Sequence, residues 1–155
     1  MDVLFYLLLV FVGGAIPFVE YMLAIPFGII AGVPTIPVIV IGFAGNLIAV
    51  ILLIWIFDYV LAIRRKRKNQ MNPDVKNYTP NSKRAQKAKN LWDKYGIPGL
   101  TLIGTGLLSS HATALMASSF GGNRAYITIW MVISLAIWSI ITGAAVHFGM
   151  DVFFR

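Results

Sequence analysis

Long apolar runs separated by charged positions dominate the pattern of this chain. The charges divide it into four apolar blocks, at residues 3–19, 21–57, 95–123 and 125–150. The hydrocarbon core of a bilayer is about 30 Å thick, so a helix needs about 20 residues to cross it. The first and last blocks therefore fit one crossing each, whereas the second is too long for one crossing and short for two.

Prolines and glycines explain the length of the second block. They crowd its first half and the approach to it, whereas residues 38–56 are rich in Ile, Val and Leu and contain no proline. An interior proline removes a helix hydrogen bond and clashes with the preceding turn. We therefore predict a re-entrant hairpin at residues 15–34 and a transmembrane helix at residues 35–63. The breakers of this hairpin are Pro17, Pro26, Gly28 and Pro34.

The third block has the same character. Gly and Pro punctuate it, and several Ser and Thr residues make it polar for a helix that faces lipid. We predict a second re-entrant hairpin at residues 96–122 and a transmembrane helix at residues 123–150. Irregular backbone at membrane depth is tolerated only where protein buries it or where it lines a wet cavity, so two such hairpins predict a cavity. The breakers here are Pro98, Gly104 and Gly106.

The predicted architecture is an all-α integral membrane protein with a single transmembrane domain, residues 1–155. A first membrane helix at residues 3–19 is expected to belong to the mature chain and not to a removed signal peptide. Two halves follow, each a re-entrant hairpin plus a long transmembrane helix, and they have inverted topology if the loop between them is cytoplasmic. Paired Gly/Pro-interrupted segments of this kind indicate a transport site.

Composition favours lipid as the solvent. Apolar residues make up 58% of the 155 residues and charged residues 12%, against about 25% charged in soluble domains. Of the 13 Lys and Arg residues, all but Arg124 and Arg155 lie between Arg64 and Lys94. The positive-inside rule makes the loop at residues 64–95 cytoplasmic, in the cell inner membrane.

The basic loop has predicted structure and partners of its own. Its first residues lie where anionic lipid headgroups attract them, and residues 82–95 predict an amphipathic helix on the membrane surface, which Ser82 can cap and Gly96 can end.

Nucleic-acid binding is disfavoured because no recognition motif accompanies the charge. Besides membrane lipids, a second copy of the chain could shield the hairpins, as a homodimer. The chain has no cysteine and only two distant histidines, so we expect no metal site and no cofactor.

Glu20 is the most informative candidate residue. It lies in the run Ile-Pro-Phe-Val-Glu-Tyr at residues 16–21, and intramembrane ionisable residues are usually functional. Burial penalises the charged form of a carboxylate, so such a group can take up and release a proton near neutral pH. The functional interpretation is proton coupling or substrate gating. The alternative is a carboxylate at the outer water interface, at the end of the first helix.

Arg124 is the second candidate. Its guanidinium could bind an anionic head such as phosphate bidentately, or it could be a snorkelling cation at the inner end of the last helix. If both hairpins reach the midplane, Glu20 and Arg124 could face one cavity. If the hairpins are shallow, the two residues lie near opposite surfaces.

Three further polar residues are weaker candidates for the substrate and proton pathway. Asp58 is expected to pair with Arg64 or Arg65, with a proton relay as the alternative. Close helix packing with an interhelical hydrogen bond accounts for Asn46. His111 could carry a proton within the second hairpin.

Several motifs resemble the family of putative small multidrug export proteins. Residues 16–20, followed by Ala-Ile-Pro-Phe-Gly at residues 24–28, resemble its opening motif, and Gly-Asn at residues 45–46 resembles its next segment. Residues 95–100 and the Gly-Thr-Gly run at residues 104–106 resemble its second half. The family usually has a Pro-rich turn before that run, where this chain has Leu-Ile.

The resemblance implies a function. The family is similar to the DedA superfamily, whose members have two opposed re-entrant hairpins and are linked to proton-dependent movement of lipid carriers and phospholipids. An acidic residue in the first hairpin and arginines after the second are implied in function there, and Glu20 and Arg124 match them by position. We therefore expect a small transporter that couples protons to the movement of a lipid or amphipathic anion, a polyprenyl phosphate or phospholipid.

Two other functions stay open. A small cationic-drug/proton antiporter would use Glu20 to bind drug and proton alternately. A membrane scaffold that transports nothing would recruit anionic lipid or a partner through the basic loop. An enzyme is not expected, because the Ser-Ser-His run at residues 109–111 lacks a Gly-x-Ser-x-Gly elbow and a nearby carboxylate.

Overall fold

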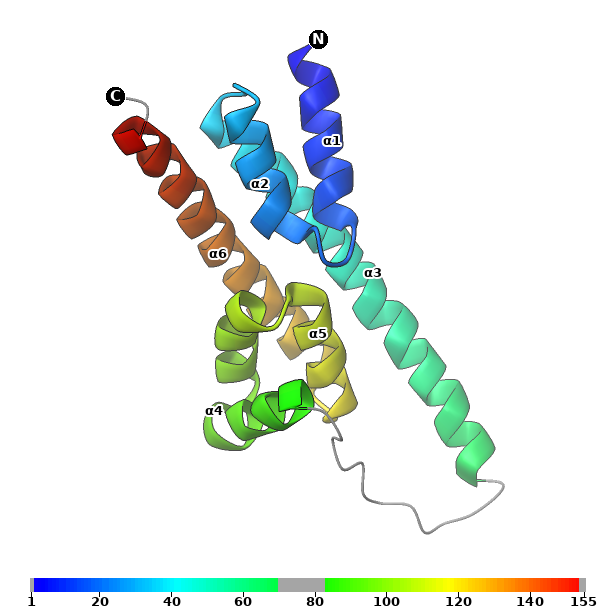
Figure 1. Ribbon diagram of the computed structural model, residues 1–155. Helices are drawn as coiled ribbons and strands as arrows, with labels where there is room; N and C mark the ends of the chain where they lie inside the picture. Colours follow the sequence, from blue (N-terminus) through cyan, green and yellow to red (C-terminus); the bar gives the residue numbers. More distant parts are fainter. Residues whose placement is uncertain (1, 70–82, 154–155) are drawn as a thin grey trace. The chain divides into compact units, whose positions relative to one another are not determined.

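The computed structural model describes residues 2–69 and 83–153. Every regular element in these residues is an α-helix, so the prediction of an all-α chain is confirmed for the described part (Figure 1). In chain order the helices are α1 (Val3–Ala15), α2 (Glu20–Ile30), α3 (Thr35–Asn69), α4 (Lys83–Leu107), α5 (Ser110–Ser119) and α6 (Arg124–Phe153).

The helices form two compact units. The first comprises residues 1–50 and 131–155, and thus α1, α2, the first part of α3 and the second part of α6. The second comprises residues 51–130, with the rest of α3 and α6 and all of α4 and α5. Each unit has its own buried apolar residues. They include Val10, Ile25, Val38, Val50 and Leu135 in the first unit, and Ile54, Leu100, Ala114, Ala117 and Ile127 in the second.

The first hairpin is not where the sequence predicted it. α1 ends at Ala15 and not at residue 19, because Ile16 precedes a proline and takes an extended conformation, with φ −77° and ψ 125°. The chain reverses at residues 16–19, and α2 then packs beside α1 in the opposite direction (Figure 1). The arms of the hairpin are therefore α1 and α2. Residues 15–34 hold the turn and the single helix α2, so one arm, α1, lies before the predicted range.

The predicted breakers of this hairpin differ in what they do. Pro17 lies in the turn before α2 and Pro34 directly precedes α3, as expected of breakers. Pro26 and Gly28 lie inside α2. Pro26 lacks the N–H of one helix hydrogen bond but does not end α2. Gly28 is a packing position, since a Cβ there would lie 2.7 Å from Val10 Cγ2.

α3 is longer than predicted. It begins at Thr35, as expected, but continues to Asn69, six residues past the predicted end. The basic run at residues 64–68 therefore extends the helix and does not open the loop, because Lys and Arg are good helix formers. Residues 70–82 of the predicted loop, including the predicted cap Ser82, lie outside the described residues. The side chains of Asp58 and of its expected partners Arg64 and Arg65 also lie outside them.

α4 consists of two arms that meet at Gly96. Gly96 has φ 65° and ψ −156° inside the helix, so the arm from Lys83 ends at the residue that the sequence indicated. The second arm, residues 97–107, packs against α5 (Figure 1). Pro98 lies in the first turn of this arm, where its missing N–H is tolerated.

Gly104 and Gly106 are not breakers. Both lie inside the second arm of α4, and the chain turns only at residues 108–109. Gly104 packs directly on α5, because a Cβ there would lie 2.8 Å from Thr113 Oγ1. A glycine inside a helix costs only about 1 kcal/mol relative to alanine, and this close contact gives it a structural reason.

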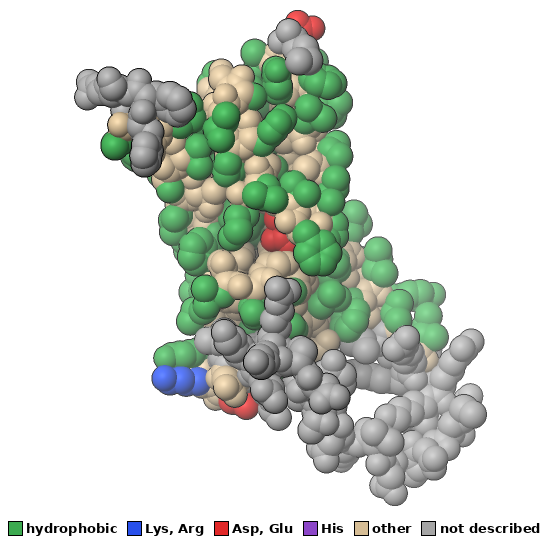
Figure 2. All heavy atoms as spheres, in the orientation of Figure 1, with side chains coloured by type: hydrophobic (Ala, Val, Ile, Leu, Met, Phe, Trp, Pro, Cys, Tyr) green, Lys and Arg blue, Asp and Glu red, His purple; other side chains and the backbone are tan. Residues whose placement is uncertain are grey.

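Apolar side chains cover much of the surface in Figure 2. Two helical stretches, Thr35–Phe57 with 23 residues and Arg124–Met150 with 27, are long and apolar enough to cross a membrane, judged by length and composition. α1 and α2 are also apolar but shorter. Large apolar side chains remain exposed on the long helices, among them Leu52, Trp55, Ile56, Ile129 and Ile140.

Candidate functional site

The turn between α1 and α2 holds Glu20 in an unusual backbone conformation. Phe18 has a φ of 77° and Glu20 a φ of 49°, in the left-handed region that residues other than glycine rarely adopt. The Glu20 N–H donates to the Ile16 carbonyl at 3.0 Å, which closes the turn. Strained conformations persist only where the surroundings fix them, and they cluster at functional sites.

Glu20 is a buried carboxylate, only 4% exposed. It occupies the first turn of α2, where unpaired N–H groups and the helix dipole favour a negative charge. Its neighbour Tyr21 is fully buried. The described residues of the first unit contain no Lys or Arg. An acidic group in such a unit is suited to bind protons or other cations, not anions.

Close contacts between α1 and α3 hold this turn in place. A Cβ on Gly14 would lie 2.7 Å from the Gly42 carbonyl oxygen, and a Cβ on Gly45 would overlap the Phe11 carbonyl. Such backbone-to-backbone approach is typical of helix pairs in membranes. Because Gly14 lies shortly before the turn, the α1–α3 contact fixes where the turn begins.

Asn46 belongs to the same contact region. It is fully buried, and its backbone nitrogen lies 3.3 Å from where a Cβ on Gly14 would stand. α1 therefore passes α3 closely at Asn46. This is the packing environment in which the sequence analysis expected an interhelical role for the amide.

Arg124 lies in the second unit and is exposed. Its guanidinium carbon is 5.5 Å from the centre of the Trp55 ring, and Trp55 is 59% exposed. The preceding residue, Asn123, caps α6, since its Oδ1 accepts from the N–H groups of Ala125 at 3.0 Å and Tyr126 at 3.3 Å. An arginine over an exposed indole resembles the aromatic and basic residues of membrane interfaces.

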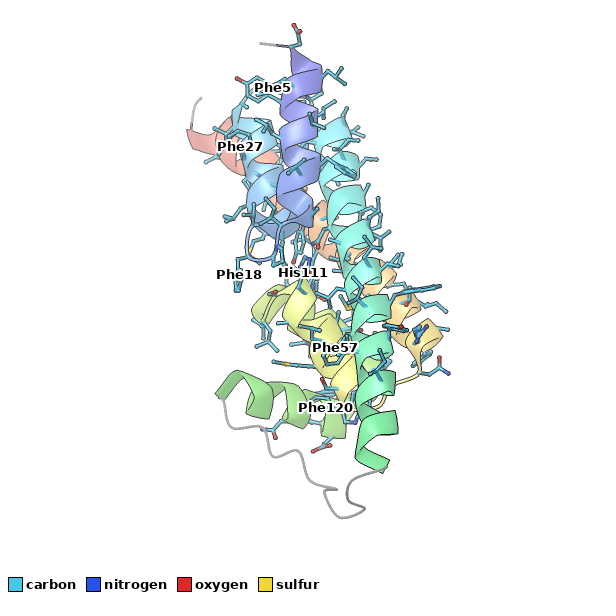
Figure 3. All side chains as sticks on the ribbon, turned by 90° about the vertical axis from the view of Figure 1, so that its right-hand side faces the viewer. Phe5, Phe18, Phe27, Phe57, His111 and Phe120 are labelled. Carbon is cyan, nitrogen blue, oxygen red and sulfur yellow. The ribbon has the colours of Figure 1, made fainter. Side chains whose placement is uncertain are left out.

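His111 lies in the first turn of α5, where Figure 3 labels it. It is 5% exposed, and its Nδ1 lies 3.3 Å from Ser110 Oγ. Buried hydroxyls continue through this hairpin, at Thr101 and Thr105 on α4 and at Thr113 and Ser118 on α5. In the second hairpin these hydroxyls lie among buried apolar residues such as Leu100, Ala114 and Ala117.

The candidate residues divide between the units. Glu20 and Asn46 belong to the first, and Asp58, His111 and Arg124 to the second. In the described ranges, no group of three His, Cys, Asp or Glu residues could hold a metal ion.

The sequence analysis missed one link and one neighbour. Thr35 Oγ1 and His147 Nδ1 lie 3.1 Å apart, joining α3 to α6 within the first unit across 112 residues of sequence, and no local signal marks such a pair. Tyr21 was also missed, although its place directly after Glu20 in an apolar run indicates burial.

The described residues form an all-helical fold with two helices long and apolar enough to cross a membrane. A model of the family described as "Putative small multi-drug export protein" matches residues 20–141, which is most of the chain. The chain therefore belongs to this family, as the motifs predicted, and the family and the apolar helices together support a membrane protein of the export class. The further link to the DedA superfamily stays a prediction. No curated protein and no solved structure matches the chain.

Proposed function

We propose that this chain is a proton-coupled membrane exporter of amphipathic cations, in which Glu20 binds a proton and the cation alternately. The burial of Glu20 at a turn between two apolar helices carries the proposal. Burial disfavours the charged form of a carboxylate relative to the neutral form. Either a proton or a bound cation removes that cost, and each excludes the other, which is the basis of exchange.

The lengths of the helices support a re-entrant first hairpin. α1 has 13 residues and α2 has 11, so they are about 20 Å and 16 Å long and cannot cross about 30 Å of hydrocarbon. The tip of the hairpin is apolar, with Ile16 46% and Phe18 85% exposed. A tip of this kind is favourable in hydrocarbon and unfavourable in water, so Glu20 lies within the membrane.

The second hairpin is proposed to be re-entrant for the same reason. Its arms, residues 97–107 and α5, are each only about 16 Å long, and Leu107 near its tip is 75% exposed. The loop after α3 is proposed to be cytoplasmic and the protein to lie in the inner membrane. The inverted topology that the sequence predicted stays a prediction.

The choice of a cation over an anionic lipid reverses the order that the sequence favoured. The lipid hypothesis needs Arg124 as a headgroup ligand, but Arg124 is exposed and lies over the exposed Trp55. Glu20 is the buried charge, and a carboxylate selects cations. The family description names drug export. The transport test below therefore also measures the movement of an anionic lipid.

Flux into proteoliposomes tests the proposal. Purified protein is reconstituted, a pH gradient is imposed, and uptake of tetraphenylphosphonium is compared with movement of a polyprenyl phosphate. We expect gradient-driven flux of the cation, reduced to the level of empty liposomes by Glu20→Gln. Glutamine has the shape and neutrality of the protonated carboxyl, so this variant should fold while losing exchange.

Asp93→Asn is the matched control, because Asp93 is an exposed carboxylate in the second unit. It should transport like the wild type. Full proton-driven flux in Glu20→Gln would sink the proposal. Movement of the polyprenyl phosphate without movement of the cation would replace it with the lipid hypothesis.

A further inference from the structure

Phe18 combines two properties that packing does not explain. Its side chain is 85% exposed and its φ is 77°, and Figure 3 shows it projecting from the turn before α2. Glycine would adopt this backbone conformation without strain. The sequence instead keeps a large ring there, and an outlier of this kind is a reason to look for function.

Another exposed phenylalanine in the same unit shows the contrast. Phe27 on α2 has helical backbone and packs against the Tyr6 ring, with centroids 6.4 Å apart. It is 49% exposed. No ring contact of Phe18 occurs among the described residues. Phe27 thus has a packing role that Phe18 lacks.

The position of Phe18 beside Glu20 indicates what the ring could bind. Two residues along an extended chain separate Cα atoms by at most about 7 Å, which is within the size of one organic cation. A ring face attracts a cation within about 6 Å of its centroid, and more strongly where water is excluded. A lipophilic cation dissolved in the bilayer could therefore contact the exposed ring of Phe18 while approaching the buried carboxylate of Glu20.

We propose that Phe18 determines specificity for lipophilic cations, by binding the cation on its ring face at the hairpin tip before Glu20 receives it. The inference rests on the proposed function, because Glu20 must be the cation site. Phe18 lies outside the residues that the family model matches, so the family description does not assign it a role. The aromatic face, and not hydrophobicity alone, is the property required.

Kinetics of tetraphenylphosphonium uptake test this role in the reconstituted full chain. Phe18→Leu keeps an apolar group but loses the ring face, and we expect KM to rise by roughly five- to thirty-fold with kcat within about twofold of the wild type. Phe18→Trp keeps a stronger ring face, so its KM should equal the wild-type value or fall below it. Phe27→Leu is the control and should leave both constants unchanged.

Phe18→Gly covers the case in which Phe18→Leu folds poorly, because glycine relieves the backbone while removing the ring. It should show the same rise in KM. Wild-type KM in both ring-less variants, with flux still abolished in Glu20→Gln, would overturn the role of Phe18 and leave the proposed function standing. Full flux in Glu20→Gln would instead overturn the proposed function, and this inference with it.

Discussion

At Gly45, α3 passes directly against the backbone of α1. A Cβ added there would overlap the Phe11 carbonyl oxygen and would lie 3.0 Å from the Phe11 carbonyl carbon and 3.2 Å from its Cα. All three atoms are backbone, so no side chain can rotate aside. Gly45→Ala must therefore move α1 away from α3, and with it the turn that holds Glu20.

The expected loss of stability follows from two opposing effects. Overpacking a buried contact lowers the free energy of unfolding by about 1–3 kcal/mol. Because the backbone of Phe11 cannot move aside, Gly45→Ala should lie towards the upper end of that range. Alanine in place of a helical glycine raises the free energy of unfolding by about 0.5–1 kcal/mol, because alanine favours the helix. Gly149→Ala isolates this second effect, since a Cβ at Gly149 in α6 would meet nothing within 4 Å. The helix gain is common to both variants, so their free energies of unfolding should differ by the overpacking cost alone, about 2–3 kcal/mol.

Thermal unfolding of the detergent-solubilised protein, followed by tryptophan fluorescence, measures this difference. Gly149→Ala should unfold at or slightly above the wild-type temperature, and Gly45→Ala below it, with Tm values roughly 4–12 °C apart. Equal Tm values for the two variants would refute the close approach of α1 and α3. They would also remove the physical reason given for the position of the α1–α2 turn.

Substitutions at four other positions test the turns and the arginine site by the same unfolding assay. Gly121→Ala should lower the free energy of unfolding by about 1–2 kcal/mol. The loss comes from the φ of 87° alone, because a Cβ there meets no atom within 4 Å, and Gly121→Asn should lose less. Equal losses in the two variants would contradict this. Asn123→Ala should lower the free energy of unfolding by about 0.5–2 kcal/mol, because it removes the α6 cap. Asn123→Asp keeps a capping oxygen and should retain most of that stability. Trp55→Leu and Arg124→Gln should couple by about 0.5–1 kcal/mol in a double-mutant cycle, and additive effects would argue against their contact.

The helices themselves followed from the sequence where the signal was local. The start of α3 at Thr35, the start of α6 beside residue 123 and the end of the first α4 arm at Gly96 all lie at positions that the sequence marked. Long apolar runs, capping side chains and a glycine in a left-handed conformation act over a few residues. Their effects can therefore be predicted without knowledge of distant contacts.

The errors came from residues whose role depends on distant partners. The sequence predicts Pro26, Gly28 and Gly104 as breakers, but each lies inside a helix, and the two glycines pack against residues on other helices. A glycine that breaks a helix and one that admits a neighbouring helix are identical in sequence. The end of α1 has a local cause, because Ile16 precedes a proline and takes an extended conformation.

The candidate site was only partly visible in the sequence. An acidic residue in an apolar run singled out Glu20, but nothing local predicted the left-handed backbone of Phe18 and Glu20. Phe and Glu rarely adopt a left-handed backbone, so residue preferences predict a different conformation at both positions. The link between Thr35 and His147 was equally hidden by its separation in sequence.

Proton release on cation binding tests the central claim most directly. Purified protein in detergent and weak buffer, at a pH where Glu20 is protonated, is mixed with tetraphenylphosphonium while the pH is recorded. If proton and cation compete for the Glu20 carboxylate, binding should release about one proton per chain in the wild type and in Asp93→Asn, and none in Glu20→Gln. Proton release of the wild-type size in Glu20→Gln, or cation binding to the wild type without proton release, would contradict the account.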